Sequence, residues 1–129
     1  MLDEISAYLQ TQGKGTVNTD IFLGELPDVK KVGNKEIDID NCIAIFETGG
    51  YEPELNFDND NAEFPTFQVM ARNRLYKTGR QKIQEIYKLL HGNTSLFPLI
   101  EAQQPPTPIG QDDKKRWEFS VNFKVIKQM

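Results

Sequence analysis

The hydrophobic pattern is clearest near the C-terminal end of the chain, where apolar and polar residues alternate. The apolar positions are Trp117, Phe119, Val121, Phe123 and Val125. A period of two is typical of a β-strand with one buried face. A shorter alternation predicts a second strand of this kind over Pro65–Arg72.

Three other segments favour strands without alternating strictly. Cys42–Phe46 is apolar at every position, which suits a central strand covered on both faces, and Gly49–Gly50 is expected to end it. Shorter apolar stretches predict strands over Thr19–Leu26 and Leu96–Gln103.

Two segments show helical spacing instead. The spacing of Leu2, Ile5 and Leu9 predicts a short amphipathic helix that ends at Gly13. A longer helix is predicted over Leu75–Leu90, with His91-Gly92 closing it. Its apolar stripe consists of Tyr76, Ile83, Ile86, Tyr87 and Leu90.

The intervening segments are expected to be loops. Val29–Asp40 is polar and is interpreted as an exposed loop. Prolines in Pro105–Pro108 predict an extended connector with few hydrogen bonds. Gly110–Lys115 is expected to form the turn before the last strand. Lys114, Lys115 and Arg116 are interpreted as a hairpin tip whose charge Asp112 and Asp113 balance.

The segment Tyr51–Phe64 is unusually acidic and contains no basic residue. We interpret it as a long acidic loop, and a long loop in a compact domain suggests a function. The carboxylates that define it are Glu52, Glu54, Asp58, Asp60 and Glu63.

Together these elements predict an α+β fold in a single domain over residues 1–129. We expect one mixed, mainly antiparallel sheet of about five strands, with two helices packed on one face. A chain of 129 residues is long enough to bury a proper core without disulfides or a metal ion.

Composition removes several function classes. One cysteine and one histidine exclude an intrachain disulfide, Cys-rich zinc sites and paired-histidine metal motifs. The first residues lack the features of a signal peptide, and no apolar run is long enough to span a bilayer. We therefore expect no metal, no cofactor and no membrane partner.

Catalytic residues are equally scarce. Cys42 lies within an apolar run, where a buried core thiol is expected, and His91 falls at a predicted helix end. No serine lies in a strand–turn–helix elbow. The sequence therefore predicts a protein that is not an enzyme.

A cluster of basic residues surrounds the start of the second predicted helix. It consists of Arg72, Arg74, Lys77 and Arg80. These side chains could contact phosphates. The alternative, a solvated helix face, is favoured because the net charge of the chain is −4.

Four stretches, taken in order, resemble the minor capsid protein family of tailed bacteriophages. They are Asp40–Gly50, Phe64–Arg72, Ile86–Gly92 and Pro108–Phe123. The resemblance rests on their combination, since none of them is a catalytic motif.

The resemblance implies a neck protein similar to tail terminators and tail-to-head joining proteins. Such a protein forms a hexameric ring that caps the tail tube, contacts the head connector or stopper and lets phage DNA pass. It would be assembled in the bacterial cytoplasm and reside in the virion. The alternatives left open are a head-completion, stopper or tail-completion protein and, less favoured, a small monomeric adaptor or an enzyme.

The family counterpart of the acidic loop varies, so the resemblance assigns the loop no role. If the loop lines the ring lumen, its carboxylates would repel DNA and let the genome slide. The alternative is that the loop, or the turn at Asp112–Lys115, projects and docks a neck partner.

Overall fold

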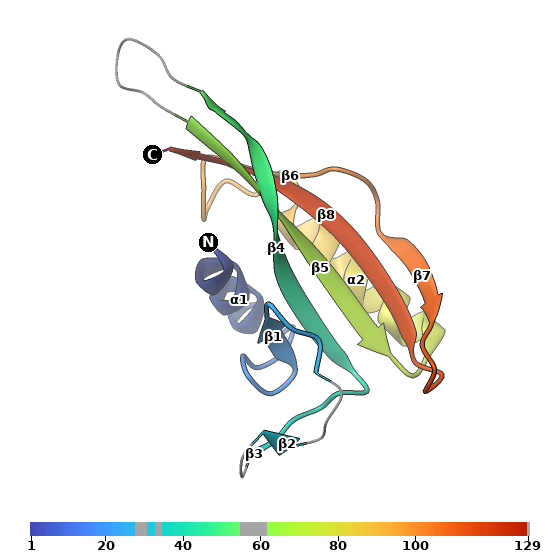
Figure 1. Ribbon diagram of the computed structural model, residues 1–129. Helices are drawn as coiled ribbons and strands as arrows, with labels where there is room; N and C mark the ends of the chain where they lie inside the picture. The colour runs from blue at the N-terminus through green and yellow to red at the C-terminus, as the bar shows by residue number, and fades with distance from the viewer. Residues whose placement is uncertain (28–30, 33–34, 55–61, 129) are drawn as a thin grey trace.

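The computed structural model of this chain describes residues 1–27, 31–32, 35–54 and 62–128 (Figure 1). The helices are α1 (Leu2–Thr11) and α2 (Tyr76–Leu90). The strands are β1 (Ile21–Leu23), β2 (Lys31–Val32), β3 (Lys35–Glu36), β4 (Cys42–Glu54), β5 (Ala62–Asn73), β6 (Leu99–Ala102), β7 (Thr107–Gln111) and β8 (Trp117–Gln128).

Six of these strands form one open sheet in the order β1-β4-β5-β8-β6, with β7 also paired to β8. The β1–β4 pair is parallel and the other pairs of this sheet are antiparallel. Strands β2 and β3 form a separate antiparallel pair. The predicted α+β fold with a mixed, mainly antiparallel sheet is therefore confirmed, and the sheet of the described residues has six strands.

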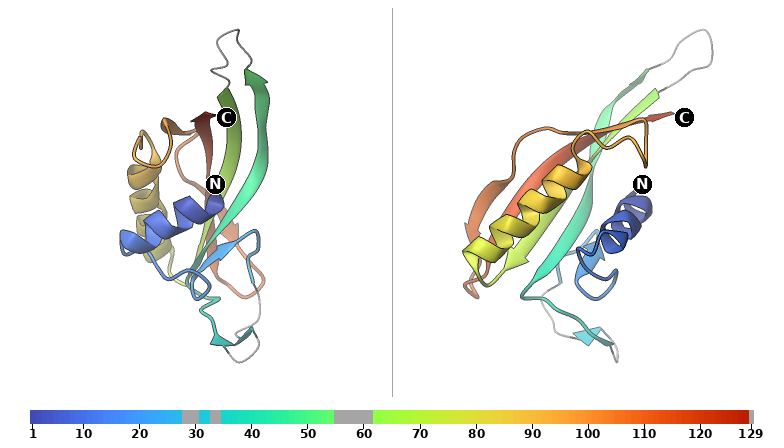
Figure 2. Two further views of the ribbon diagram at one scale, coloured as in Figure 1. Left: turned by 90° about the vertical axis from the view of Figure 1, so that its left-hand side faces the viewer. Right: turned by 180° about the vertical axis from the view of Figure 1, so that it is seen from behind.

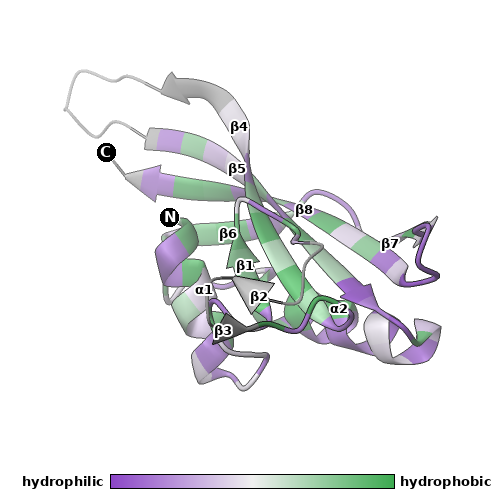
Figure 3. Ribbon diagram, turned by 60° about the horizontal axis from the view of Figure 1, so that its bottom comes forward, coloured by the Kyte–Doolittle hydropathy of each residue, from purple (hydrophilic) through white to green (hydrophobic). Residues whose placement is uncertain are grey.

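Strand register aligns the apolar positions of the three long strands. Val69 of β5 lies opposite Ile45 of β4 on one side and Val121 of β8 on the other. Phe67 and Phe123 are also register partners, and their rings stack with centroids 5.0 Å apart. The alternation in the sequence thus becomes one continuous apolar face, and hydrophobic residues gather along the middle of these strands (Figure 3).

Both helices contribute to this core. Helix α2 packs against β5 and β8, and α1 packs against β1 and β4 (Figure 2). Their buried members are Ile5 and Leu9 of α1 and Ile83, Ile86 and Leu90 of α2. The C-terminal end of α2 is as predicted, because Gly92 has a φ of +79°, a conformation that favours glycine after a helix.

The predicted end of the central strand at Gly49–Gly50 is wrong, since β4 runs on to Glu54. Its register against β5 shifts between Glu47 and Gly49, and Gly49 has a φ of +102°. A β-bulge of this kind adds an unpaired residue without ending the strand. The glycine pair therefore accommodates an irregularity within β4.

The expected acidic loop is paired at both ends, and residues 55–61 between them lie outside the described residues. Tyr51 pairs with Phe64 and Glu54 pairs with Ala62, so both ends of the segment continue β4 and β5. The paired residues, 50–54 and 62–65, form a projecting extension of the sheet that we call the arm (Figure 1). Strand β8 supports it through the pair Ala62–Gln128.

Two other expected loops also differ. Within Val29–Asp40, the side chains of Ile37 and Ile39 are buried in a second, smaller cluster with Phe22 and Cys42. Pro108 lies in β7 rather than in an unpaired connector. A proline is tolerated there because β7 is an edge strand, where one amide can be absent from the ladder.

Candidate functional site

The single cysteine and the single histidine, the residues with the greatest catalytic potential, are both held in packing or hydrogen-bond contacts within the fold. Cys42 is fully buried, and burial raises the pKa of its thiol to about 11, which disfavours the reactive thiolate. The Nδ1 atom of His91 accepts a hydrogen bond from the amide of Ala102 at 3.0 Å, and its ring stacks on Tyr87. Across the described ranges, no group of three or more His, Cys, Asp or Glu side chains is arranged to hold a metal ion.

The predicted acidic residues divide between the arm and the rest of their segment. Glu52 and Glu54 lie on β4, and Glu63 lies on β5 opposite Lys127 of β8. Asp58 and Asp60 fall outside the described residues. The structure therefore brings three of the five positions to the projecting end of the sheet, and their role stays a prediction.

The predicted basic patch is divided as well. Arg74, Lys77 and Arg80 are exposed around the start of α2, whereas Arg72 is only 7% exposed. The Arg72 guanidinium faces the interior and donates a hydrogen bond to the carbonyl oxygen of Pro27 at 3.0 Å. Arg72 is thus buried, unlike the other three residues, and its side chain is not available to a partner.

Arg72 belongs to an ionic cluster, largely buried except for Arg74 at its exposed edge, that was not predicted from the sequence. Its centre is Arg116, which is 1% exposed and contacts the Asp112 carboxylate through Nη2 at 2.9 Å and Asp40 through Nη1 at 3.4 Å. Three arginines and three carboxylates take part: Arg72, Arg74, Arg116, Asp40, Asp112 and Glu118. Their formal charges cancel, as burial of charged groups requires.

The cluster connects segments that are distant in sequence. Nη1 of Arg116 also donates a hydrogen bond to the carbonyl oxygen of Ile39 at 3.1 Å. Arg72 lies at the end of β5, and Asp112 lies in the turn between β7 and β8. The cluster therefore fixes the segment before β4 and the β7–β8 turn to the end of the sheet.

The expected hairpin tip is present between β7 and β8, and Asp112 balances the charge of Arg116 as predicted, but the Arg116 side chain is buried. Within the turn Asp112–Arg116, the Asp112 carboxylate accepts hydrogen bonds from the amides of Lys114 and Arg116, which directs the Arg116 side chain inward. The sequence held one indication of this burial, because Arg116 directly precedes the strand whose apolar residues form the core.

The electrostatics of the cluster favour ionised carboxylates. Partial burial by itself raises the pKa of Asp112, but the hydrogen bonds from the backbone and guanidinium of Arg116 outweigh it, and the net pKa is lowered. For Asp40, burial is likewise outweighed by the hydrogen bond and charge of Arg74 and by Arg116, so its pKa is also lowered.

These lowered pKa values predict loss of stability in acid. A carboxylate whose pKa is lower in the folded than in the unfolded state stabilises the fold. This stabilisation is complete above the pKa of the unfolded state and is lost as the pH falls through the pKa of the folded state. The ordinary aspartate value is 3.8. We expect the free energy of unfolding, measured with urea, to fall below that pH.

The Asp112→Asn variant tests whether Asp112 contributes to this loss of stability in acid. It should be less stable than the wild type at pH 7. Its free energy of unfolding should fall less steeply as the pH is lowered, because only one of the two carboxylates with a lowered pKa remains. Parallel pH profiles for the two proteins would contradict the assignment.

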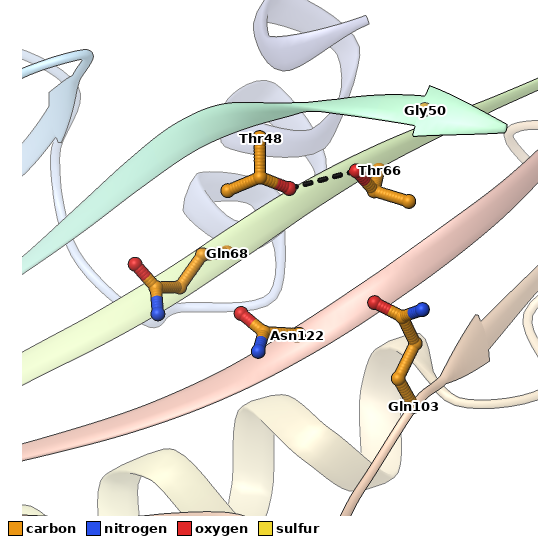
Figure 4. A pocket seen from close by; sticks show the side chains of 6 residues that line it. All are labelled: Thr48, Gly50, Thr66, Gln68, Gln103 and Asn122. Atoms are coloured by element: carbon orange, nitrogen blue, oxygen red, sulfur yellow. Dashed lines mark hydrogen bonds between the residues drawn. The ribbon is translucent and has the colours of Figure 1, made fainter.

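The second face of the sheet presents a neutral polar groove (Figure 4). The groove encloses about 400 Å³ and is lined by Thr48, Gly50, Thr66, Gln68, Gln103 and Asn122. The hydroxyls of Thr48 and Thr66 form a hydrogen bond of 2.8 Å across β4 and β5. Amides and hydroxyls donate and accept hydrogen bonds but do not titrate near neutral pH. The groove therefore offers neutral hydrogen-bond donors and acceptors.

Comparison with known protein families finds a match over nearly the whole chain. A family model described as bacteriophage tail terminator protein matches residues 8–129, nearly the whole chain. No curated protein matches the sequence.

Proposed function

The chain belongs to the bacteriophage tail terminator family, and from this premise we propose that it ends the growing tail tube and joins the tail to the head. The family makes it a structural component of the phage tail and of the virion, with other phage proteins as its partners. The observation that supports the proposal is the extent of the match, which covers both helices and every strand apart from part of α1.

The form in which the chain acts is a closed ring, six-fold in our proposal. A cyclic ring uses two different surfaces of each subunit, one on each side. The sheet offers two dissimilar edges: β1 pairs with β4 only at Ile43–Ile45, and β6 and β7 form the other edge. Contact with neighbouring subunits would cover strand edges that otherwise invite nonspecific pairing.

The partners in this proposal are the tail tube protein on one side of the ring and the head connector or stopper on the other. Phage DNA passes through the lumen during packaging and ejection. The family is structural, which supports a role without catalysis. None of the helices that the structure describes is long and apolar enough to cross a membrane.

Deletion of the gene from the phage that encodes it tests the proposal. Electron microscopy of the lysate should show headless tails of abnormal length, because nothing ends tube growth. Supply of the protein from a plasmid should restore uniform tails joined to heads.

Another outcome would assign the chain to a different level of the neck. Tails of normal length beside full heads that leak DNA would contradict a terminator and indicate a stopper. Normal, infectious particles would contradict both roles.

A further inference from the structure

The start of α2 presents two unpaired cations beside an aromatic ring. The ring of Tyr76 contacts those of Trp117 and Phe119 on β8, at centroid distances of 5.1 and 5.3 Å. Arg80 stands four residues after Tyr76 and three after Lys77, so the three side chains are neighbours on the helix surface. Lys77 and Arg80 are exposed, and neither forms an ion pair within the described residues.

Strand β7 adds an apolar side chain to this part of the surface. It pairs with β8 at Phe119, whose ring contacts Tyr76. Ile109 of β7 is 56% exposed and Tyr76 is 41% exposed. Tyrosine and arginine are enriched among the residues that contribute most to protein–protein binding. We call this surface the basic edge, and it consists of Tyr76, Lys77, Arg80 and Ile109.

The opposite edge of the sheet, at β1, is acidic. Asp3 is exposed in the first turn of α1, which packs on β1 and β4. Glu25 follows the end of β1, and Glu47 lies on β4 two residues beyond Ile45, the last partner of β1. The three carboxylates are exposed, and among the residues that the structure describes none of them has an ion-pair partner. We call Asp3, Glu25 and Glu47 the acidic edge.

The elements that form each edge carry little charge of the opposite sign. Residues 1–27 contain one basic side chain, Lys14, and it pairs with Glu85 of α2 at 2.9 Å. Glu85 is also the one carboxylate of α2, and β7 contains no charged residue. The two edges of the sheet therefore differ in the sign of their charge.

The two edges of one molecule do not meet. Strands β4, β5 and β8 lie between β1 and β7, which stand on opposite sides of the molecule (Figure 1). A contact between unlike edges therefore joins two molecules. A contact between like edges, as in a two-fold dimer, would bring equal charges together. The charges thus favour head-to-tail association, the type that can close into a ring.

On the basis of the ring proposed above, we propose that the acidic edge of each copy binds the basic edge of the next copy. The carboxylates of the acidic edge face the cations of the basic edge. Tyr76 and Ile109 are covered in the same contact, against Leu23 and Leu26, which flank Glu25 and are partly exposed. The contact thus matches the two edges in charge and in hydrophobicity.

Nucleic acid is the less favoured occupant of the basic edge. Phosphates are bound by positive charge, which gives the exposed Ile109 no role and leaves the acidic edge without a partner. The net charge of −4 also opposes DNA binding. A second copy uses the charges of both edges and the apolar side chains.

Charge reversal tests the proposal. One variant combines Lys77→Glu with Arg80→Glu, and the other combines Glu25→Lys with Glu47→Lys. Self-association is measured by sedimentation velocity and mass photometry, with and without purified tail tubes. We expect each variant alone to associate about tenfold more weakly than the wild type or worse, because like charges then face each other at every contact.

Mixing the two variants gives the decisive comparison. The first variant is acidic at both edges and the second is basic at both, so each binds the other but not itself. Alternating rings should form from the mixture, and native mass spectrometry should find equal numbers of the two variants in each ring. A ring with six copies can alternate in this way because its number of copies is even.

A matched pair of single variants controls for net charge. Arg80→Glu and Lys88→Glu make the same change of charge on the same helix, and Lys88 is also exposed but lies two turns beyond Arg80, outside the basic edge. Arg80→Glu should weaken association, whereas Lys88→Glu should associate like the wild type. Circular dichroism checks that all variants are folded. Equal losses for the two single variants would overturn the assignment of the contact.

The remaining outcomes are distinct. Weak association of each double variant with restored rings in the mixture supports the proposal. Wild-type association of both folded double variants, a folded mixture that stays dissociated, or a wild type that stays monomeric with tail tubes present overturns it. Loss of DNA binding with intact association also overturns it and assigns the basic edge to nucleic acid. Mixed rings that form as expected but do not bind tails would contradict the proposed function and leave the contact between the edges standing.

Discussion

Replacing Phe119 with alanine is expected to lower the free energy of unfolding by about 3–5 kcal/mol. Phe119 is 1% exposed and lies near the start of β8, where α2 meets the sheet. A methyl group added at Gly79 of α2 would lie 2.8 Å from the ring of Phe119, so helix and strand already approach closely. Removal of the ring leaves a cavity that this tight packing cannot close.

Urea titration of the Phe119→Ala variant measures the loss. Trp117→Ala is the matched comparison, because Trp117 lies on the same face of β8 but is only partly buried, in a T-shaped contact with the Tyr76 ring. Its expected loss is smaller. A loss below about 1 kcal/mol for Phe119→Ala would contradict its place in the core.

Replacing Arg116 with alanine is expected to cost a similar amount, about 3–5 kcal/mol. The substitution removes the buried guanidinium that contacts both Asp112 and Asp40, and Asp112 retains the longer contact to Arg72 at 3.7 Å. It also removes the hydrogen bond to the carbonyl of Ile39, which anchors the second apolar cluster. Breaking one side of a buried pair is costly because the opposite charges stay behind.

Arg74→Ala is the control for this prediction. Arg74 also pairs with Asp40, at 3.1 Å, but its side chain is 56% exposed. Exposed pairs contribute only about 0–1 kcal/mol, so this variant should unfold almost like the wild type. Equal losses for Arg74→Ala and Arg116→Ala would show that the buried cluster does not stabilise the fold.

Much of the fold was predictable because it depends on local periodicity. The alternation from Trp117 to Val125 and the stripe of Leu75–Leu90 each match an observed element, β8 and α2, within a few residues. In both cases one face is apolar and the other polar, so the period alone identifies the element.

The predictions are wrong where tertiary contacts determine the secondary structure or the burial of a residue. The acidic residues of the arm have low strand propensity, yet pairing of β5 with β4 and β8 holds Glu54 and Glu63 in strands. Ile37 and Ile39 are isolated apolar residues in a polar segment, and only the folded sheet provides the cluster that buries them.

The candidate surfaces were predictable only in part. Sequence identified the exposed basic residues Arg74, Lys77 and Arg80, but it could not separate them from Arg72, whose side chain faces the interior. It also could not find the cluster around Arg116, because its members come from segments more than 30 residues apart, as in the hydrogen bond between Arg116 and Ile39, 77 positions apart. Such pairings depend on the whole topology.

Electron cryomicroscopy of tails assembled with the purified protein tests the central claim most directly. The account predicts one closed ring of this chain, with six copies, at one end of each tail tube and tubes of uniform length. Tubes whose ends carry no such density, or protein bound along the tube wall as single copies, would contradict it.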